Sequence, residues 1–185
     1  MRKKTFTLID LVLSIVLMSS IIMMVYCVYT FFARQVPYNR ERYDMLSQIN
    51  YALEDMKVRL VSASQVDAGS LFSLTTTSFS DAKQKFKFFG EKDIYKITPN
   101  DTADDIWYEY RIDNKSLILE THGVAGATKE ILVDSRYQPQ VAFEWYEGYE
   151  PNFFTVVITA KGTTNPPVEI SRTEGIRFWF VDVKQ

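Results

Sequence analysis

The chain has 185 residues and a net charge of −2, and its sequence pI is near 5.5. Lysine and arginine are scattered rather than gathered in a basic stripe, so no nucleic-acid partner is expected. Cys27 is the only cysteine and lies in an apolar run, which excludes a disulfide within the chain. We interpret it as a small apolar helix residue, with palmitoylation or an intermolecular disulfide as the alternatives.

The first element is an apolar run from Leu11 to Phe32, 22 residues without a charged side chain. Roughly 20 such residues cross the hydrocarbon core of a bilayer, whereas the core of a signal peptide has about 7–15. Basic residues at positions 2–4 precede the run and Arg34 follows it, which favours a cytoplasmic N-terminus. We predict a single-pass membrane helix, with the C-terminal part exported.

Asp10 is the one carboxylate at the start of this helix. A carboxylate within a membrane helix costs about 2.5–3.5 kcal/mol on insertion scales, and less near the interface. One interpretation is that Asp10 lies at headgroup depth, where water reaches it. The other is that it pairs with a positive group from a neighbouring molecule, because such an attraction is weakly screened in apolar surroundings.

The basic leader, the pentapeptide Phe6-Thr7-Leu8-Ile9-Asp10 and the long apolar helix resemble the class III signal of type IV pilins and type II secretion pseudopilins. The resemblance implies cleavage by a prepilin peptidase between Thr5 and Phe6 and N-methylation of Phe6. It also implies that Asp10 is the assembly carboxylate, which pairs with an N-terminal amine. Thr5 stands where the family has Gly, and Asp10 is one methylene shorter than the usual Glu.

After the membrane run, Pro37 either kinks the helix or marks its exit from the membrane. Apolar residues then recur at spacings of three and four, which predicts an amphipathic helix over 36–66, ending between 62 and 69. A coiled-coil seam is the alternative to packing on a sheet. The apolar stripe consists of Leu46, Ile49, Leu53, Met56 and Leu60.

From about Leu71 the chain reads as short alternating strands separated by turn residues. The clearest hairpin runs from Ile106 to Ile112, turns at Asn114-Lys115 and returns through Leu117. The lone His122 is expected in a turn, so no histidine-based metal cluster or catalytic triad is expected. Further predicted strands are Glu130 to Val133, Val141 to Tyr146, Phe153 to Ala160, Val168 to Arg172 and Ile176 to Val183.

The predicted fold class is α+β, with a long N-terminal helix packed on an antiparallel sheet. The expected organisation is a leader at 1–5, a transmembrane and assembly helix at 6–35, the amphipathic helix at 36–66 and a β-rich exported domain at 67–185. The order of elements is similar to J-type minor pseudopilins and W-type minor pilins. The matching segments are 108–113, Leu117, 131–134, 143–146 and 169–173.

No catalytic residues, metal ligands or cofactors are predicted. The carboxylates Asp134 and Glu144 fall in turns or on polar strand faces, as do Asp101, Asp104, Asp105, Glu147 and Glu150, without the opposed environments of an acid/base pair. The cluster at 100–105 matches a calcium loop poorly. Five aromatic residues, Trp145, Tyr146, Tyr149, Phe153 and Phe154, form either core or a partner-binding surface.

The resemblance implies a minor pilin or pseudopilin that assembles at a filament tip. Its partners would be other minor and major pilins or pseudopilins, the prepilin peptidase and the inner membrane. The alternative is a membrane-anchored exported binding module that never enters a filament. The sequence does not distinguish a secretion system, a motility pilus or a DNA-uptake apparatus.

Overall fold

The computed structural model describes residues 7–61, 63–67, 85–90, 106–123, 126–146, 152–178 and 182–184. The chain forms two compact units, residues 1–40 and 41–185. Unit 1 contributes the N-terminal part of one long helix, and unit 2 combines the rest of that helix with two β-sheets. The α+β class is therefore confirmed for the described chain.

The helix α1 spans Leu8–Val61, 54 residues, and Pro37 lies inside it. The helix continues through Pro37, so the stretches predicted at 6–35 and 36–66 belong to one helix, and the first continues into the second as expected. The predicted end at residue 66 is wrong, since α1 stops at Val61 and Ala63–Asp67 form strand β1. A proline removes one backbone hydrogen bond from the helix. The hydrogen bonds of the long helical stretches on both sides of Pro37 remain, so the helix is not interrupted.

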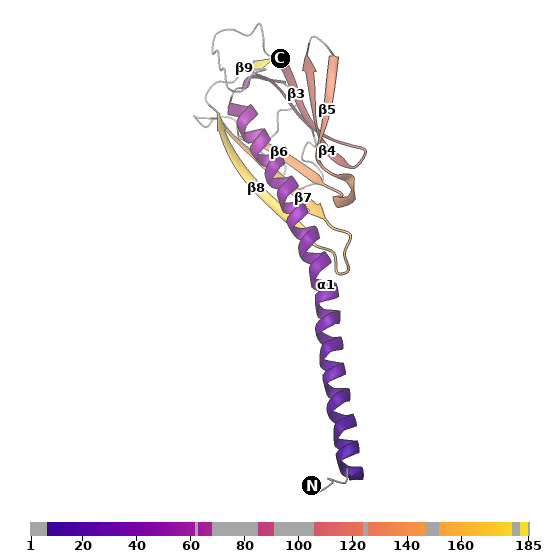
Figure 1. Cartoon of the computed structure of the whole chain (residues 1–185). Coiled ribbons are helices and arrows are strands. Elements are labelled where there is room, and N and C mark those ends of the chain that lie inside the picture. The colour runs from indigo at the N-terminus through magenta and orange to yellow at the C-terminus, as the bar shows by residue number, and fades with distance from the viewer. Residues whose placement is uncertain are drawn as a thin grey trace. The chain divides into compact units, whose positions relative to one another are not determined.

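Among the described residues, the larger sheet has six strands in the order β5-β4-β3-β2-β1-β9. Figure 1 labels four of them, β3, β4, β5 and β9. The pairs of this sheet are antiparallel except for β1 and β9, which run parallel. Besides β1, its strands are β2 (Lys85–Gly90), β3 (Ile106–Asp113), β4 (Ser116–Gly123), β5 (Gly126–Val133) and β9 (Asp182–Lys184).

The smaller sheet is antiparallel and has three strands in the order β6-β7-β8. These are β6 (Gln140–Tyr146), β7 (Asn152–Lys161) and β8 (Glu169–Phe178). The 3-10 helix η2 (Ser135–Tyr137) connects β5 to β6, and Asp134 caps it by accepting a hydrogen bond from the Arg136 N–H at 2.9 Å. Asp134 thus lies at a turn, as expected.

The predicted hairpin is confirmed as β3 and β4. Asn114 and Lys115 both have positive φ angles, 50° and 65°, and Asp113 pairs with Ser116. Two successive positive φ values define a type I′ turn, whose twist matches that of the flanking strands. The alternation predicted from Ile106 places Tyr108 and Tyr110 in the core.

Several strand predictions need correction. The two strands expected at 168–172 and 176–183 are one strand, β8, because the residues between them continue the pairing with β7, including Thr155 with Gly175. Residues 182–184 form the separate β9. His122 lies in β4 opposite Trp107 rather than in a turn. The β1 and β2 strands were not predicted.

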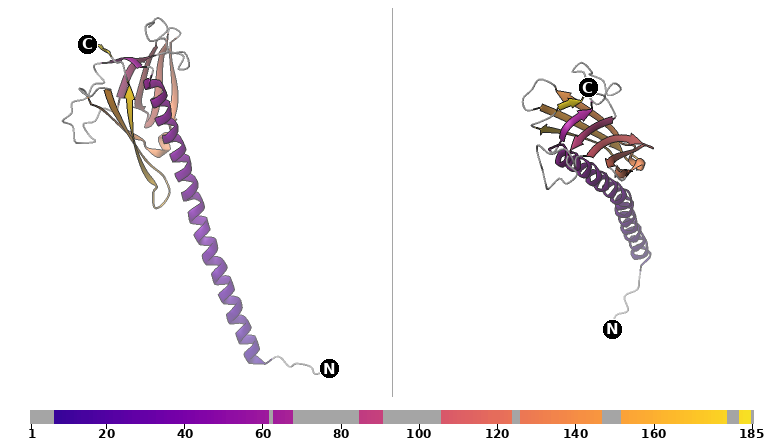
Figure 2. Two further views of the ribbon diagram at one scale, coloured as in Figure 1. Left: turned by 90° about the vertical axis from the view of Figure 1, so that its left-hand side faces the viewer. Right: turned by 90° about the horizontal axis from the view of Figure 1, so that it is seen from above.

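The core of unit 2 is built from the C-terminal part of α1 and both sheets. Along α1 the buried residues include four of the predicted stripe, Ile49, Leu53, Met56 and Leu60, while Met45 replaces Leu46. The Phe86 and Phe143 rings, 5.6 Å apart, join the two sheets. The strands lie to one side of this helical segment (Figure 2), so its polar face remains exposed.

Candidate functional site

The N-terminal end of α1 is capped by Thr7 and Asp10. The Thr7 N–H and hydroxyl both donate to Asp10 Oδ2, at 3.1 and 2.8 Å, and the Asp10 N–H reaches Thr7 Oγ1 at 3.4 Å. This reciprocal arrangement is a capping box, which satisfies backbone donors that a helix start leaves unpaired. Within the described chain, Asp10 Oδ1 accepts no hydrogen bond, so one oxygen of this carboxylate remains available.

The expected processing site lies just outside the described residues. Thr5 and Phe6 precede Thr7, which is the first residue that the structure describes. The predictions of cleavage between them and of N-methylation on Phe6 therefore remain predictions.

From Leu11 to Phe32 the surface of α1 is apolar and largely exposed, and α1 is long and apolar enough to cross a membrane. Cys27 is a free, exposed thiol on this surface. The hydroxyl groups of Ser14, Ser19 and Ser20 donate to the carbonyl four residues earlier at 2.7–2.9 Å, and Thr30 donates to the Cys27 carbonyl at 3.0 Å. Such internal hydrogen bonds let hydroxyls sit in lipid without an unsatisfied donor.

A buried polar contact fixes the C-terminal part of α1 to β3. The hydroxyl of Tyr110, which is fully buried, donates to Asp55 Oδ2 at 2.8 Å, and Arg59 Nε donates to Asp55 Oδ1 at 2.8 Å. The Arg59 guanidinium also lies 5.0 Å from the centre of the Tyr108 ring. Burial and the Asp55 carboxylate raise the pKa of Tyr110 well above its usual value, so this hydroxyl stays a donor.

Glu41 binds the turn between β7 and β8. Its carboxylate accepts hydrogen bonds from the Thr163 N–H at 2.6 Å, the Thr163 hydroxyl at 2.7 Å and the Thr164 N–H at 3.0 Å. Desolvation acts to raise the pKa of Glu41, but the hydrogen bonds from Thr164 and Thr163 outweigh it and lower the pKa to about 2. One helix turn further on, Asp44 accepts hydrogen bonds from Arg136 and the Tyr137 hydroxyl.

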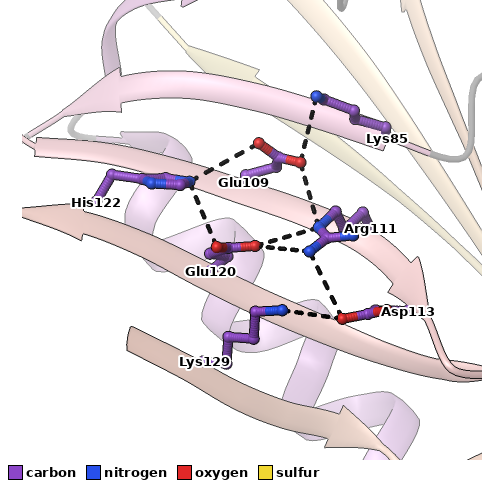
Figure 3. A network of polar contacts seen from close by, with 7 residues as sticks. All are labelled: Lys85, Glu109, Arg111, Asp113, Glu120, His122 and Lys129. Atoms are coloured by element: carbon purple, nitrogen blue, oxygen red, sulfur yellow. Dashed lines mark hydrogen bonds and ion pairs between the residues drawn. The ribbon is translucent and has the colours of Figure 1, made fainter. Parts of the chain in front are cut away.

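A polar network crosses β2, β3, β4 and β5 on the sheet face opposite Tyr108 and Tyr110 (Figure 3). Glu109 and Glu120 stand directly opposite each other on β3 and β4. Like charges in that position destabilise a strand pair unless cations intervene. Arg111 supplies the main compensation: its Nη2 lies 2.8 Å from Glu120 Oε2, and its Nε lies 3.4 Å from Glu109 Oε1.

The rest of the network extends this compensation to the neighbouring strands. Lys85 Nζ lies 3.3 Å from Glu109 Oε1, and Lys129 Nζ lies 3.1 Å from Asp113 Oδ2. The hydrogen bond from Arg111 lowers the pKa of Glu120, and the one from Lys129 lowers the pKa of Asp113. Both carboxylates therefore stay ionised, and the network links side chains of four strands.

His122 lies at the end of this network. Its buried Nε2 has no hydrogen-bond partner in the described structure and lies 3.9 Å from Glu109 Oε2 and 4.0 Å from Glu120 Oε1. These separations exceed hydrogen-bonding distance. Among the described residues, no group of His, Cys, Asp and Glu side chains has the arrangement of a metal site. We assign the network a structural role in the sheet.

The remaining sequence candidates are only partly placed. Trp145 and Tyr146 lie on β6, and Phe153 and Phe154 on β7, at paired positions, but the description covers only their backbone. The same holds for Glu144. The acidic cluster at 100–105, Glu147, Tyr149 and Glu150 lie outside the described residues.

Comparison with known proteins gave no family assignment: no protein-family model matches the chain, and no curated protein matches it.

Proposed function

We propose that the chain is a minor pilin or pseudopilin that is anchored in the inner membrane and assembles into the tip of a type IV pilus or type II secretion pseudopilus. The observation that carries the proposal is the single helix α1, whose N-terminal part exposes apolar residues on all sides and whose C-terminal part belongs to an α+β unit. Such a helix suits both a bilayer and a bundle of like helices.

The capping box sharpens the role proposed for Asp10. Both Thr7 donors use Oδ2, so Oδ1 can accept a hydrogen bond from the N-terminal amine of a neighbouring subunit. An α-amine has a reference pKa of about 7.7–8.0 and is mostly protonated at neutral pH. Pairing would offset the cost of holding a carboxylate among apolar helices.

The first experiment is intact and N-terminal peptide mass spectrometry on the chain from the membranes of its own host. A chain that starts at N-methylated Phe6 supports prepilin processing despite Thr5. A chain that still starts at Met1 contradicts it and favours the second candidate, an anchored exported binding module outside any filament.

A second experiment separates charge pairing from helix capping. Asp10→Asn keeps an oxygen that can accept from Thr7 but removes the charge, whereas Thr7→Val removes the capping hydroxyl and keeps the charge. We expect Asp10→Asn and Asp10→Ala to insert into membranes normally but to be depleted from filaments at least tenfold, and Thr7→Val to assemble almost normally. Equal filament content for Asp10→Asn and the parent chain would contradict the pairing role.

A further inference from the structure

The segment of α1 from Tyr26 to Arg40 has the order of residues found where a membrane helix leaves the bilayer. The uncharged run ends at Ala33, and Tyr26 and Tyr29, one to two turns earlier, are 66% and 70% exposed. Arg34 and Arg40 follow, and both are exposed. Tyrosines gather at the headgroup level of bilayers, and arginines lie just beyond it.

Pro37 gives an independent indication of depth. Because proline has no N–H, the Ala33 carbonyl loses the helical donor that residue 37 would otherwise supply. A carbonyl that lacks this donor must be paired in another way, and at the membrane boundary water can donate to it. A position of Ala33 and of Arg34, the next residue, at headgroup depth accounts for this pairing.

The charges of these arginines are not neutralised by the chain itself. Arg34 and Arg40 make no ion pair or hydrogen bond with any side chain in the part of the chain that the structure describes. In contrast, Arg59, Arg111 and Arg136 each contact a carboxylate. Both guanidinium groups are thus available to an external anion.

We propose that Arg34 and Arg40 bind the phosphate groups of anionic phospholipids in the leaflet where α1 leaves the membrane. A guanidinium donates two parallel hydrogen bonds to a phosphate, and an anionic surface attracts each nearby cation by about 1 kcal/mol. Arg40 lies about 9 Å further along the helix axis, roughly one Debye length, so its effect is smaller. The inference rests on the membrane anchor of the proposed function and not on filament assembly.

The test uses the full chain in nanodiscs of phosphatidylcholine with or without phosphatidylglycerol, with retained lipids counted by native mass spectrometry. The parent chain should retain phosphatidylglycerol in preference to phosphatidylcholine. Arg34→Gln should reduce this preference about fivefold, the factor equivalent to about 1 kcal/mol, and Arg40→Gln should reduce it less. Arg34→Lys should keep part of the preference because it keeps the charge but not the planar fork.

Arg172→Gln is the matched control, since Arg172 is exposed on β8 and its loss changes the net charge equally. An Arg34→Gln variant that matches Arg172→Gln would overturn the proposal, as would equal retention of the two lipids by the parent chain. Resistance to alkaline extraction is measured in parallel. A chain that extracts with alkali contradicts the membrane anchor, whereas an anchored chain without lipid preference contradicts only the lipid proposal.

Discussion

In unit 1, α1 presents apolar side chains to its surroundings on every side, and its hydroxyls bond to its own carbonyls. In unit 2, the same helix buries one stripe and holds both sheets through carboxylates on its flanks, including Glu41, Asp44 and Asp55. One continuous helix therefore has an exposed apolar part and a part that packs against the sheets. The difference shows that surface chemistry, and not helix formation, divides the two units.

The largest difference in unfolding free energy is expected when isoleucine is replaced by alanine once in each of the two parts of α1. Ile49 is fully buried and Ile22 is 63% exposed. We expect Ile49→Ala to lower the free energy of unfolding by about 2–5 kcal/mol, because it leaves a cavity between the helix and the sheets. Ile22→Ala should change it by less than about 0.5 kcal/mol. Both free-energy changes are measured by urea unfolding of the full chain in detergent, monitored by tryptophan fluorescence.

Equal unfolding midpoints for these two variants would contradict the division of α1 into an exposed apolar part and a part packed against the sheets. Membrane extraction provides the converse test. Ile22→Asp should impair insertion, since a central carboxylate costs about 2.5–3.5 kcal/mol.

A smaller effect is expected from the buried contact that only the second part of α1 makes. Tyr110→Phe removes the hydroxyl that donates to Asp55 and leaves a carboxylate oxygen without that donor. The expected loss in unfolding free energy is about 1–3 kcal/mol. Tyr51→Phe is the control: its hydroxyl donates to Glu130 at 2.9 Å, but Tyr51 is 53% exposed. Water can replace that contact, so equal losses would contradict the role of burial.

The sequence predicts those parts of the fold whose signals are local. The buried stripe at Ile49, Leu53, Met56 and Leu60 follows from helical periodicity, and the β3–β4 turn follows from Asn114-Lys115 between alternating strands. Lysine and phenylalanine alternate from Lys85 to Phe88, and this local pattern indicates strand β2. The strand predicted at 176–183 includes two residues of β9, but the parallel pairing of β9 with β1 is a long-range contact that no local pattern predicts.

The candidate site divides in the same way. Asp10 stands out because it is one charge in an apolar helix, and the pairing of Glu109 with Glu120 follows once the hairpin register is known. The contact between Glu41 and Thr163 joins residues 122 positions apart, and no local pattern predicts it. The turn predicted at His122 is wrong because β4 includes His122 and ends only at the adjacent Gly123.

The smallest effect is the pH dependence of the Glu41 contact. The pKa of Glu41 falls from 4.5 to about 2 in the folded chain, so the unfolded chain binds a proton first. The contact therefore stabilises the fold above pH 4.5, and this stabilisation is lost as the pH falls through about 2. Because Glu41 is partly exposed, the gain is about 1 kcal/mol or less.

Glu41→Gln should remove this part of the acid sensitivity, measured as the slope of unfolding free energy against pH between about 2 and 4.5. Gly162→Ala offers a matched test that keeps the carboxylate, since a Cβ at residue 162 would lie 2.7 Å from the Glu41 carboxyl group and displace it. Both variants should show the same reduced slope. A parental slope in both would mean that Glu41 contributes nothing to the pH dependence, and the charge of Glu41 would then not stabilise the fold.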